Sequence, residues 1–282
     1  MAFTSHYHTT PNGTTAHYTQ SGNPTGPPIL LLHGLGGSTE TFTPLLPHLH
    51  PEHYRLISID LEGFGKTPLS TPDTTLSIHR YVNDLESLVF SLQNTSNKSQ
   101  SIILIGHSLG GIIATQYAAK RPDTIAGLVL LGTGRSIAHI PAARERMLSL
   151  AAKTRTEGIH AAAETASVSN FPMTGAIDPK LRDAVRDAVL KCDVEGYAKA
   201  CEAVADLNHL DPDYSVITAP TMLIAGGGDV ISPPERSVGV QEAIGENAWV
   251  EVLKGVGHQF ILQDLEGCAR VLGGFFERVA GA

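Results

Sequence analysis

The sequence predicts a doubly wound α/β fold, that is, a mostly parallel sheet with helices on both faces. Three observations predict it: short apolar runs alternate with helical patterns, the N-terminus has the pattern of an antiparallel hairpin, and a helix-rich stretch interrupts the alternation. The chain has 282 residues and 42% hydrophobic residues, which is enough for a buried core and for one large domain or a domain with an insertion.

The strand predictions come from the short apolar runs. Residues 3–10 and 14–20 are strand-like and flank Pro11-Asn12-Gly13, where Pro11 can set the turn and Gly13 can take a positive φ. This pattern predicts an N-terminal antiparallel hairpin. Runs that are apolar on both faces are typical of a parallel sheet covered by helices, and they follow at 28–33, 54–60, 101–106, 125–132, 220–226 and 248–253.

The helix predictions divide the chain into two parts. Segments with helical spacing separate the strands at 77–93, 109–120, 234–244 and 264–279. After the sixth strand the strands stop and Ala, Glu, Arg and Lys become frequent, with helical patterns at 141–157, 158–168, 179–191 and 194–206. We therefore expect an α/β core of residues 1–134 and 214–282, and a helical cap of residues 135–213 that lies over the sheet.

The net charge and the cysteine pattern limit which binding partners and which cellular compartment are expected. The formal net charge is -8 and no run rich in Lys or Arg occurs, so nucleic acid and anionic membranes are not expected partners. Cys192, Cys201 and Cys268 are odd in number and widely spaced, which indicates reduced, buried thiols in a reducing compartment. Without a signal-like start or an apolar run of about 20 residues, we expect a cytoplasmic monomer or homodimer.

The strand at 101–106 ends in a motif that favours a nucleophile. Gly106-His107-Ser108-Leu109-Gly110 has the form G-x-S-x-G and joins a strand to a helix. Gly106 and Gly110 allow the backbone to turn sharply and the helix to pack close to the strand. This nucleophile elbow, which includes His107, exposes the Ser108 hydroxyl.

Two further strands end in residues that could activate this serine. A serine hydroxyl needs a neighbouring base, and the base needs an acceptor that fixes its tautomer. Asp229 follows the strand at 220–226 and His258 follows the last strand. The order Ser, Asp, His and the position beyond the carboxyl ends of strands both suit a catalytic triad.

Backbone amides are the expected stabilisers of an oxyanion. Each such donor is worth about 2.7–4 kcal/mol of barrier in acyl transfer. The Leu109 N–H lies at the start of a helix, where the helix dipole helps. The loop "HGLGG" after the strand at 28–33 offers the Leu35 N–H as the second donor.

Four motifs in order resemble the α/β-hydrolase fold family over nearly the whole chain. They are "HGLGG" (33–37), "DLEGFGKT" (60–67), "GHSLGG" (106–111), and "GGGDVISPPE" (226–235) followed by "GVGH" (255–258). Within this family the chain is most similar to the 3-oxoadipate enol-lactonase branch, since "TRTEGIHAAAET" (154–165) and "DVEGYAKACEAVADLN" (193–208) resemble its cap pattern. The resemblance implies a Ser108, Asp229, His258 hydrolase with a helical cap, no cofactor and no metal.

The chain departs from the enol-lactonase pattern in the cap. Those proteins tend to carry an Arg-Trp pair where this sequence has Ala166-Ser167, so the resemblance does not extend to a dicarboxylate-like substrate. The Ala-rich stretch at 158–166 instead favours a roomy, mostly apolar cavity. The leading hypothesis is therefore a hydrolase of an ester or lactone of a small, largely apolar molecule.

Two alternatives remain open at this point. The first is a small-molecule receptor with slow hydrolysis, because plant strigolactone receptors resemble this fold. The second is hydrolysis of a C–C bond in a dienoic acid, which would use the same triad. Epoxide and haloalkane hydrolases are disfavoured because they carry Asp where this chain has Ser108.

Other conspicuous polar residues are expected to serve structure. His33 precedes the glycine loop and is expected to brace it, His107 to pack or hydrogen-bond, and Asp60 to organise the turn of Gly63 and Gly65. The remaining candidates are a histidine group that could suggest zinc but fits a solvated surface, and acidic residues with a linker role: His48, His50 and His53, and Asp206, Asp211 and Asp213.

Overall fold

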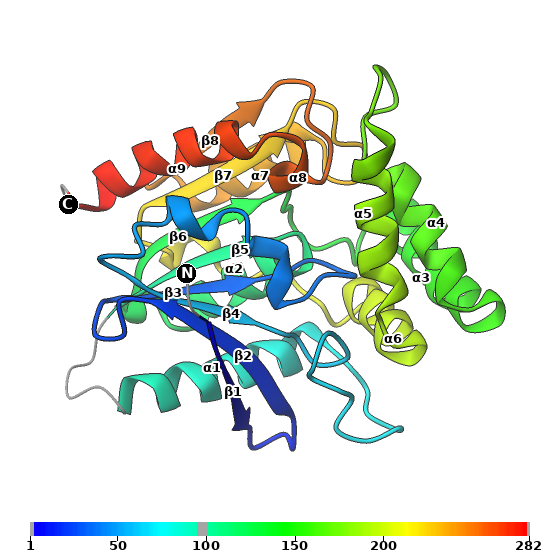
Figure 1. Ribbon diagram of the computed structural model, residues 1–282, viewed down its shortest axis with the longest axis horizontal. Helices are drawn as coiled ribbons and strands as arrows, with labels where there is room; N and C mark the ends of the chain where they lie inside the picture. The colour runs from blue at the N-terminus through cyan, green and yellow to red at the C-terminus, as the bar shows by residue number, and fades with distance from the viewer. Residues whose placement is uncertain (1–2, 95–100, 281–282) are drawn as a thin grey trace.

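The computed structural model describes residues 3–94 and 101–280 and confirms the predicted fold class. Within these residues an eight-stranded sheet has the order β1-β2-β4-β3-β5-β6-β7-β8. β1 and β2 are antiparallel, β2 is antiparallel to β4, and the pairs from β3–β4 to β7–β8 are parallel (Figure 1). The bounds are β1 Thr4–Thr9, β2 Thr15–Gly22, β3 Pro28–Leu32, β4 Arg55–Ile59, β5 Ile102–His107, β6 Ile125–Leu131, β7 Thr221–Gly226 and β8 Ala248–Leu253.

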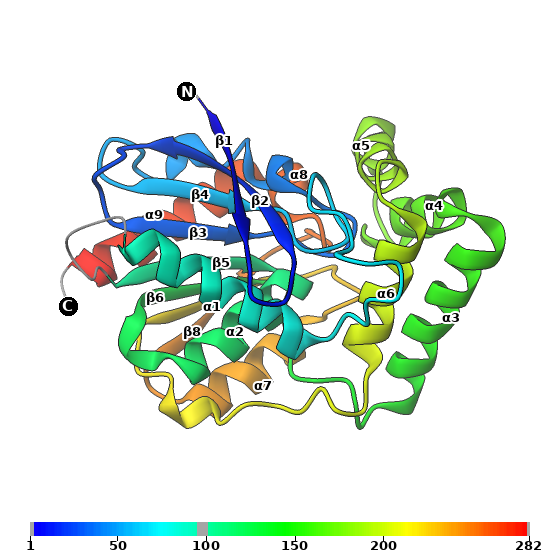
Figure 2. The same ribbon diagram turned by 90° about the horizontal axis from the view of Figure 1, so that it is seen from below.

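Helices cover both faces of the sheet. Leu30 and Leu32 of β3 pack in one cluster, with side chains of α1, α2 and α7, which Figure 2 shows together on one side of the sheet. Ile29 and Leu31 point the other way, into a cluster that includes residues of α8 and α9. The bounds are α1 Ile78–Asn94, α2 Leu109–Lys120, α7 Pro234–Ile244, α8 Phe260–Gln263 and α9 Leu265–Ala280.

Four helices follow β6 and precede β7, as the sequence predicts. They gather at one end of the sheet (Figures 1 and 2), where α3 contacts α6 and α4 contacts α5. Their bounds are α3 Pro141–Glu157, α4 Ile159–Ser169, α5 Pro179–Leu190 and α6 Val194–Ala205. Side chains from α3 and α4 line a cavity together with residues that follow β5, β6 and β7, so these helices lie over the carboxyl ends of the strands.

Two expectations need correction. β8 is an edge strand, so its run is not buried on both faces: Val252 is 49% exposed and Trp249 is half-buried, stacked on Phe275. Cys192 is half-buried rather than buried, whereas Cys201 and Cys268 are buried. The three cysteines are free thiols, and burial raises the pKa of each.

Candidate active site

Ser108 occupies a strained turn between β5 and α2. Its backbone has φ 51° and ψ -114°, which is a conformation that residues other than glycine rarely adopt. The turn is held by the Ser108 N–H, which donates to the Leu131 carbonyl oxygen at 2.9 Å. Strain of this kind persists only where the surrounding structure imposes it, and it is common at functional sites.

Glycines around Ser108 let the backbones approach closely. A Cβ on Gly106 would collide with the carbonyl group of Gly110, and a Cβ on Gly110 would collide with the Leu32 carbonyl group. The start of α2 therefore packs directly against β3 and β5. This close packing leaves Ser108 at the edge of a cavity rather than inside the core.

Asp229 and His258 form a buried pair. His258 Nδ1 lies 2.7 Å from Asp229 Oδ2, and both side chains are almost fully buried. The other oxygen, Asp229 Oδ1, accepts hydrogen bonds from the backbone N–H groups of Ile231 and Ser232, at 2.8 and 2.9 Å. A carboxylate held in this way fixes the tautomer of the imidazole, leaving Nε2 as a proton acceptor.

The backbone of His258 is held from two sides. His107 Nε2 donates to the His258 carbonyl oxygen at 2.8 Å, and the His258 N–H donates to the Asn170 carbonyl oxygen at 2.8 Å. Burial and the neighbouring His258 lower the pKa of His107 to about 3, so His107 is neutral and Nε2 carries its proton. Gln259 Nε2 also donates to Asn170 Oδ1 at 2.7 Å, which ties the end of α4 to this loop.

Ser108 and His258 line the same cavity. Within the described residues the Ser108 hydroxyl makes no hydrogen bond to His258, so the structure brings the two together without closing this last contact. Catalytic hydrogen bonds in free enzymes are often long and shorten when substrate binds. We call this cavity, about 400 Å³ in volume, the serine cavity.

The two residues whose amides are expected to hold an oxyanion are both found at this site. Leu35 and Leu109 line the serine cavity, and in the described part of the chain neither backbone N–H donates to another residue. The loop that carries Leu35 is braced by His33, whose Nδ1 bonds the Gly34 carbonyl oxygen at 2.7 Å and whose Nε2 accepts from the Leu61 N–H at 3.1 Å. Burial lowers the pKa of His33, so this bracing histidine is neutral.

Asp60 serves the turn and not the serine. Its carboxylate accepts the N–H groups of Thr39 at 2.6 Å and Lys66 at 2.9 Å, and it lies 2.7 Å from His17 Nδ1. A Cβ on Gly65 would collide with this carboxylate. Asp60 therefore organises the turn of Gly63 and Gly65, as the sequence predicts, and it also ties this turn to the loop after β3, which the sequence does not predict.

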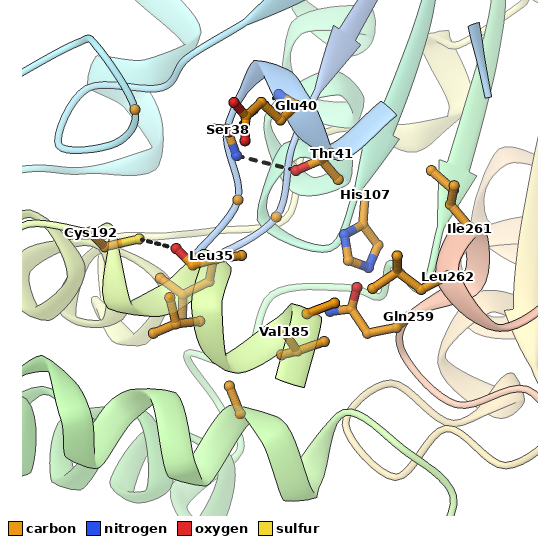
Figure 3. Close-up of a pocket in the computed structure, with 18 of the residues that line it drawn as sticks. Leu35, Ser38, Glu40, Thr41, His107, Val185, Cys192, Gln259, Ile261 and Leu262 are labelled. Atoms are coloured by element: carbon orange, nitrogen blue, oxygen red, sulfur yellow. Dashed lines mark hydrogen bonds between the residues drawn. The ribbon is translucent and has the colours of Figure 1, made fainter. Parts of the chain in front are cut away.

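A second cavity, of about 390 Å³, adjoins the serine cavity. We call it the loop cavity, because it lies between loop 34–41, α5 and segment 259–262. Figure 3 shows side chains from these segments around it, with His107 among them. The two cavities have Leu35, His107, Ala166 and Asn170 in common and so share a wall.

The remaining polar candidates lie away from the serine cavity. The histidines of "HLHPEH" are exposed, and in residues 3–94 and 101–280 no group of three or more His, Cys, Asp or Glu is arranged to hold a metal ion. Asp211 joins the core to the segment after α6, since it accepts the Ser136 N–H at 2.8 Å and the Tyr214 hydroxyl at 2.9 Å. Asp206 and Asp213 accept local backbone N–H groups, as linker residues do.

Several residues of the site carry no sequence signal of their role. Asn170 and Arg236 lie outside the four motifs, and Ser232 lies within "GGGDVISPPE" at a position to which the motif assigns no role. Arg146 and Lys153 lie seven residues apart on α3, which places them on one helical face. That spacing is the one sequence signal that could have placed two of these residues together.

The fold and this arrangement of serine, histidine and aspartate define an α/β hydrolase. Residues 27–266 match the family described as "Serine aminopeptidase, S33", and the chain belongs to that family.

Two curated relatives are hydrolases of the same superfamily. One is the (E)-2-((N-methylformamido)methylene)succinate hydrolase of Acinetobacter baylyi, 28% identical over 229 residues, or 80% of this chain and 81% of that protein. The other is the 2-hydroxy-6-oxo-6-(2'-aminophenyl)hexa-2,4-dienoic acid hydrolase of Metapseudomonas resinovorans, 24% identical over 95% of this chain and 89% of that protein.

Two solved structures are also similar over nearly the whole chain. A thermophilic esterase from Thermogutta terrifontis, with malate bound, superposes with a TM-score of 0.84 at 26% identity, covering 98% of this chain and 99% of that one. The enol-lactonase from Burkholderia xenovorans superposes with a TM-score of 0.82 at 25% identity, covering 96% of this chain and 100% of that one.

Proposed function

We propose that the protein is a serine hydrolase that cleaves a carboxylic ester or lactone of a small molecule through an acyl-enzyme on Ser108. The observation that carries this proposal is the buried Asp229–His258 pair, which opens into the same cavity as the strained Ser108. The two unengaged amides of Leu35 and Leu109 support it, since they can receive the charge that develops on the carbonyl oxygen.

The first half of the reaction forms the acyl-enzyme. His258 Nε2 takes the proton of Ser108 while Ser108 Oγ attacks the carbonyl carbon. The Leu35 and Leu109 amides hold the resulting oxyanion, and Asp229 stabilises the imidazolium. The imidazolium then protonates the departing alkoxide, so that the C–O bond of the ester breaks and the acyl group stays on Ser108.

Water completes the cycle. His258 takes a proton from the water, the resulting nucleophile attacks the acyl carbon, and the returning proton frees Ser108 Oγ and the acid. In a lactone the alkoxide stays tethered to the acyl group and can close the ring again. Residues 135–213 would act as a cap that holds both ends of such a substrate, over a core of residues 1–134 and 214–282.

Hydrolysis of a C–C bond is the second candidate. The similarity to the dienoic acid hydrolase of Metapseudomonas resinovorans favours it, because that relative aligns over 95% of this chain. The same serine, histidine and aspartate would serve, with a carbanion in place of the alkoxide as leaving group.

A panel of esters, lactones and dienoic acids tests both candidates. The proposal predicts that turnover of an ester or lactone is accompanied by a mass increase of one acyl group on the peptide that contains Ser108. Ser108→Ala should keep the fold and lose the adduct. Retained turnover in this variant would contradict the assignment, and turnover of dienoic acids alone would favour C–C bond cleavage.

Location and assembly stay predictions. A cytoplasmic monomer or homodimer without a cofactor is expected from the sequence. In the part of the chain that the structure describes, no helix combines the length and hydropathy that a membrane crossing requires.

A further inference from the structure

The serine cavity is lined by cationic side chains and by no carboxylate. Arg146 and Lys153 reach it from α3 and Arg236 from α7, while none of the described residues that line it is Asp or Glu. The whole chain has a formal net charge of -8, so this excess of positive charge is local. A cavity of one sign concentrates ligands of the opposite sign.

One face of α3 contributes two of these positively charged residues. Residues 143, 146, 147, 149, 150 and 153 line the cavity, and they share one side of the helix. Within the described residues, Arg146 forms no ion pair or hydrogen bond. Arg155, on the same helix but outside the cavity, pairs instead with Glu195 and Glu202. Among the described residues, Arg146 thus reaches the serine cavity without the ion pairs that Arg155 makes.

Arg236 is half-buried and lines the cavity from α7. Its Nη2 donates to the Arg135 carbonyl oxygen at 2.7 Å, which uses one of the five N–H donors of the guanidinium. Burial lowers the pKa of Arg236, the carboxylates of Asp211 and Asp229 raise it, and the charge of Arg146 lowers it again. Both guanidinium groups line the same cavity, so an anion bound there would be attracted to each of them.

A buried hydroxyl of the same wall lacks a partner. Ser232 is 5% exposed and lines the serine cavity, and its Oγ has no hydrogen-bond partner among the described residues. Leaving such a group unpaired is unfavourable, so a ligand that accepts its hydrogen bond is favoured. Ser232 lies in the segment that leads into α7, so its hydroxyl and the Arg236 guanidinium reach the cavity from the same part of the chain.

The loop cavity differs from the serine cavity in the charges of the residues that line it. It has acids and bases together at its wall, namely Glu40 and Asp60 beside Lys66 and Lys191. Lys191 Nζ lies 3.4 Å from Glu40 Oε2, and Asp60 is saturated by backbone N–H groups and His17. The serine cavity, by contrast, has Arg146, Lys153 and Arg236 at its wall and no described Asp or Glu.

We propose that the substrate carries a carboxylate remote from the scissile carbonyl group, bound between Arg146 and Arg236 with the Ser232 hydroxyl as a further donor. This inference rests on the proposed function and deepens it, because it names the class of ester: an ester or lactone that is also an acid. It replaces the sequence-based expectation of a largely apolar substrate. Lys153 adds positive charge at the rim, where Glu157 lies 3.9 Å away.

A matched pair of esters tests the inference. Monomethyl adipate carries the remote carboxylate, and the methyl ester of adipic acid monoamide replaces it with a neutral amide of similar shape. The corresponding glutarate and pimelate pairs vary the distance to the ester. We expect kcat/KM to favour the anionic member of the best pair by about 10-fold or more, because a hydrogen bond to a charged group is stronger than one to a neutral amide.

Variants that remove a positive charge test which residues produce the preference for the anionic ester. Arg146→Gln and Arg236→Gln should each lower the ratio of kcat/KM between the two esters by about 10-fold, mainly through KM. Arg146→Lys should retain part of it. Lys180→Gln is the matched control, because Lys180 is an exposed cation of α5 outside both cavities. Arg146 is itself exposed, so its variants should fold even if Arg236→Gln does not.

Binding measurements on a variant that lacks the nucleophile test the anion site independently of the proposed hydrolysis. Calorimetry of Ser108→Ala with monomethyl adipate should show binding that weakens in Ser108→Ala/Arg146→Gln. Equal turnover of the two esters, or a ratio unchanged by Arg146→Gln, would overturn the inference and leave the hydrolase intact. Arg146-dependent binding without turnover of any ester in the wild type would keep the anion site and overturn the ester hydrolase. Absence of both would overturn both.

Discussion

The described residues contain two buried pairs of histidine and aspartate with the same geometry. Nδ1 to Oδ2 is 2.7 Å between His17 and Asp60, and 2.7 Å between His258 and Asp229. The first pair even has a serine, since Ser5 Oγ lies 2.7 Å from His17 Nε2. By side-chain contacts alone, the hairpin holds a more complete Ser-His-Asp arrangement than the cavity does.

The surroundings of the two serines differ. Ser5 is an exposed residue in regular strand β1 at the edge of the sheet, and it lines none of the cavities described above. Ser108 has a positive φ and lines the serine cavity beside Leu109, whose amide is unengaged. A triad is defined by what it presents to a substrate, so the elbow, the free amides and the cavity distinguish the two.

The two serines should differ most in their effect on activity. We expect Ser108→Ala to lower kcat by about 10⁶-fold, because loss of the nucleophile disables the whole triad. Ser5→Ala should stay within about twofold of wild type, since a surface hydroxyl is removed far from the cavity. Steady-state kinetics on the best ester, with circular dichroism to verify folding, measures both. Equal losses in the two variants would refute the distinction.

The two aspartates should differ next. Asp229→Asn should lower kcat by about 10⁴-fold with the fold intact, because an amide no longer holds the imidazole in the tautomer that accepts the serine proton. Asp60→Asn should act through the loops instead, since Asp60 binds the N–H groups of Thr39 and Lys66. Its loss should appear in thermal unfolding before it appears in kcat. A catalytic defect in Asp60→Asn as large as that of Asp229→Asn, at unchanged stability, would contradict this.

The pair of His17 and Asp60 should stabilise the folded protein. We expect His17→Asn to lower the free energy of unfolding by about 3 kcal/mol, because breaking a buried pair leaves a charged group with too few partners. Denaturant unfolding measures this loss, with Ser5→Ala as a control that changes it by less than about 0.5 kcal/mol. A His17→Asn protein as stable as wild type would show that the pair contributes nothing to the fold.

The last prediction concerns the pH dependence of stability at His107, whose pKa is lowered to about 3 by burial and by the neighbouring His258. Between about pH 6.5 and pH 3 the unfolded chain binds a proton at this residue and the folded chain does not. Folding is therefore destabilised as the pH falls through this window, by about 1.4 kcal/mol per pH unit for one proton. His107→Asn should reduce the pH slope of the unfolding free energy between about pH 6 and pH 4. An identical slope in the variant would contradict a neutral His107.

The sequence predicts the positions of those candidate site residues that directly follow a strand. The apolar runs predict the strands, and Ser108, Asp229 and His258 each follow one of them. The sequence alone therefore predicts that these three residues lie at one end of the sheet. Glycine motifs were equally informative, because Gly106 and Gly110 are required by close backbone approach. These features depend on local pattern and on rules of sheet topology that hold for many chains.

Contacts across the fold could not be predicted in the same way. The bond from His258 N–H to the Asn170 carbonyl oxygen joins segments 88 residues apart, and no pattern in either segment indicates it. The charge of the serine cavity was missed because the direction of Arg146 depends on how α3 packs. The pair of His17 and Asp60 was missed because it forms between two strands, through side chains that no motif links.

The most direct test asks which of the two serines is the nucleophile. Incubation of the wild-type protein with a small alkyl fluorophosphonate, followed by peptide mapping, reports the reactive hydroxyl without knowledge of the substrate. The account predicts one label per chain, on Ser108 and not on Ser5, with no label in Asp229→Asn/Ser108→Ala. A label on Ser5, or an unmodified Ser108 in a folded protein, would contradict it.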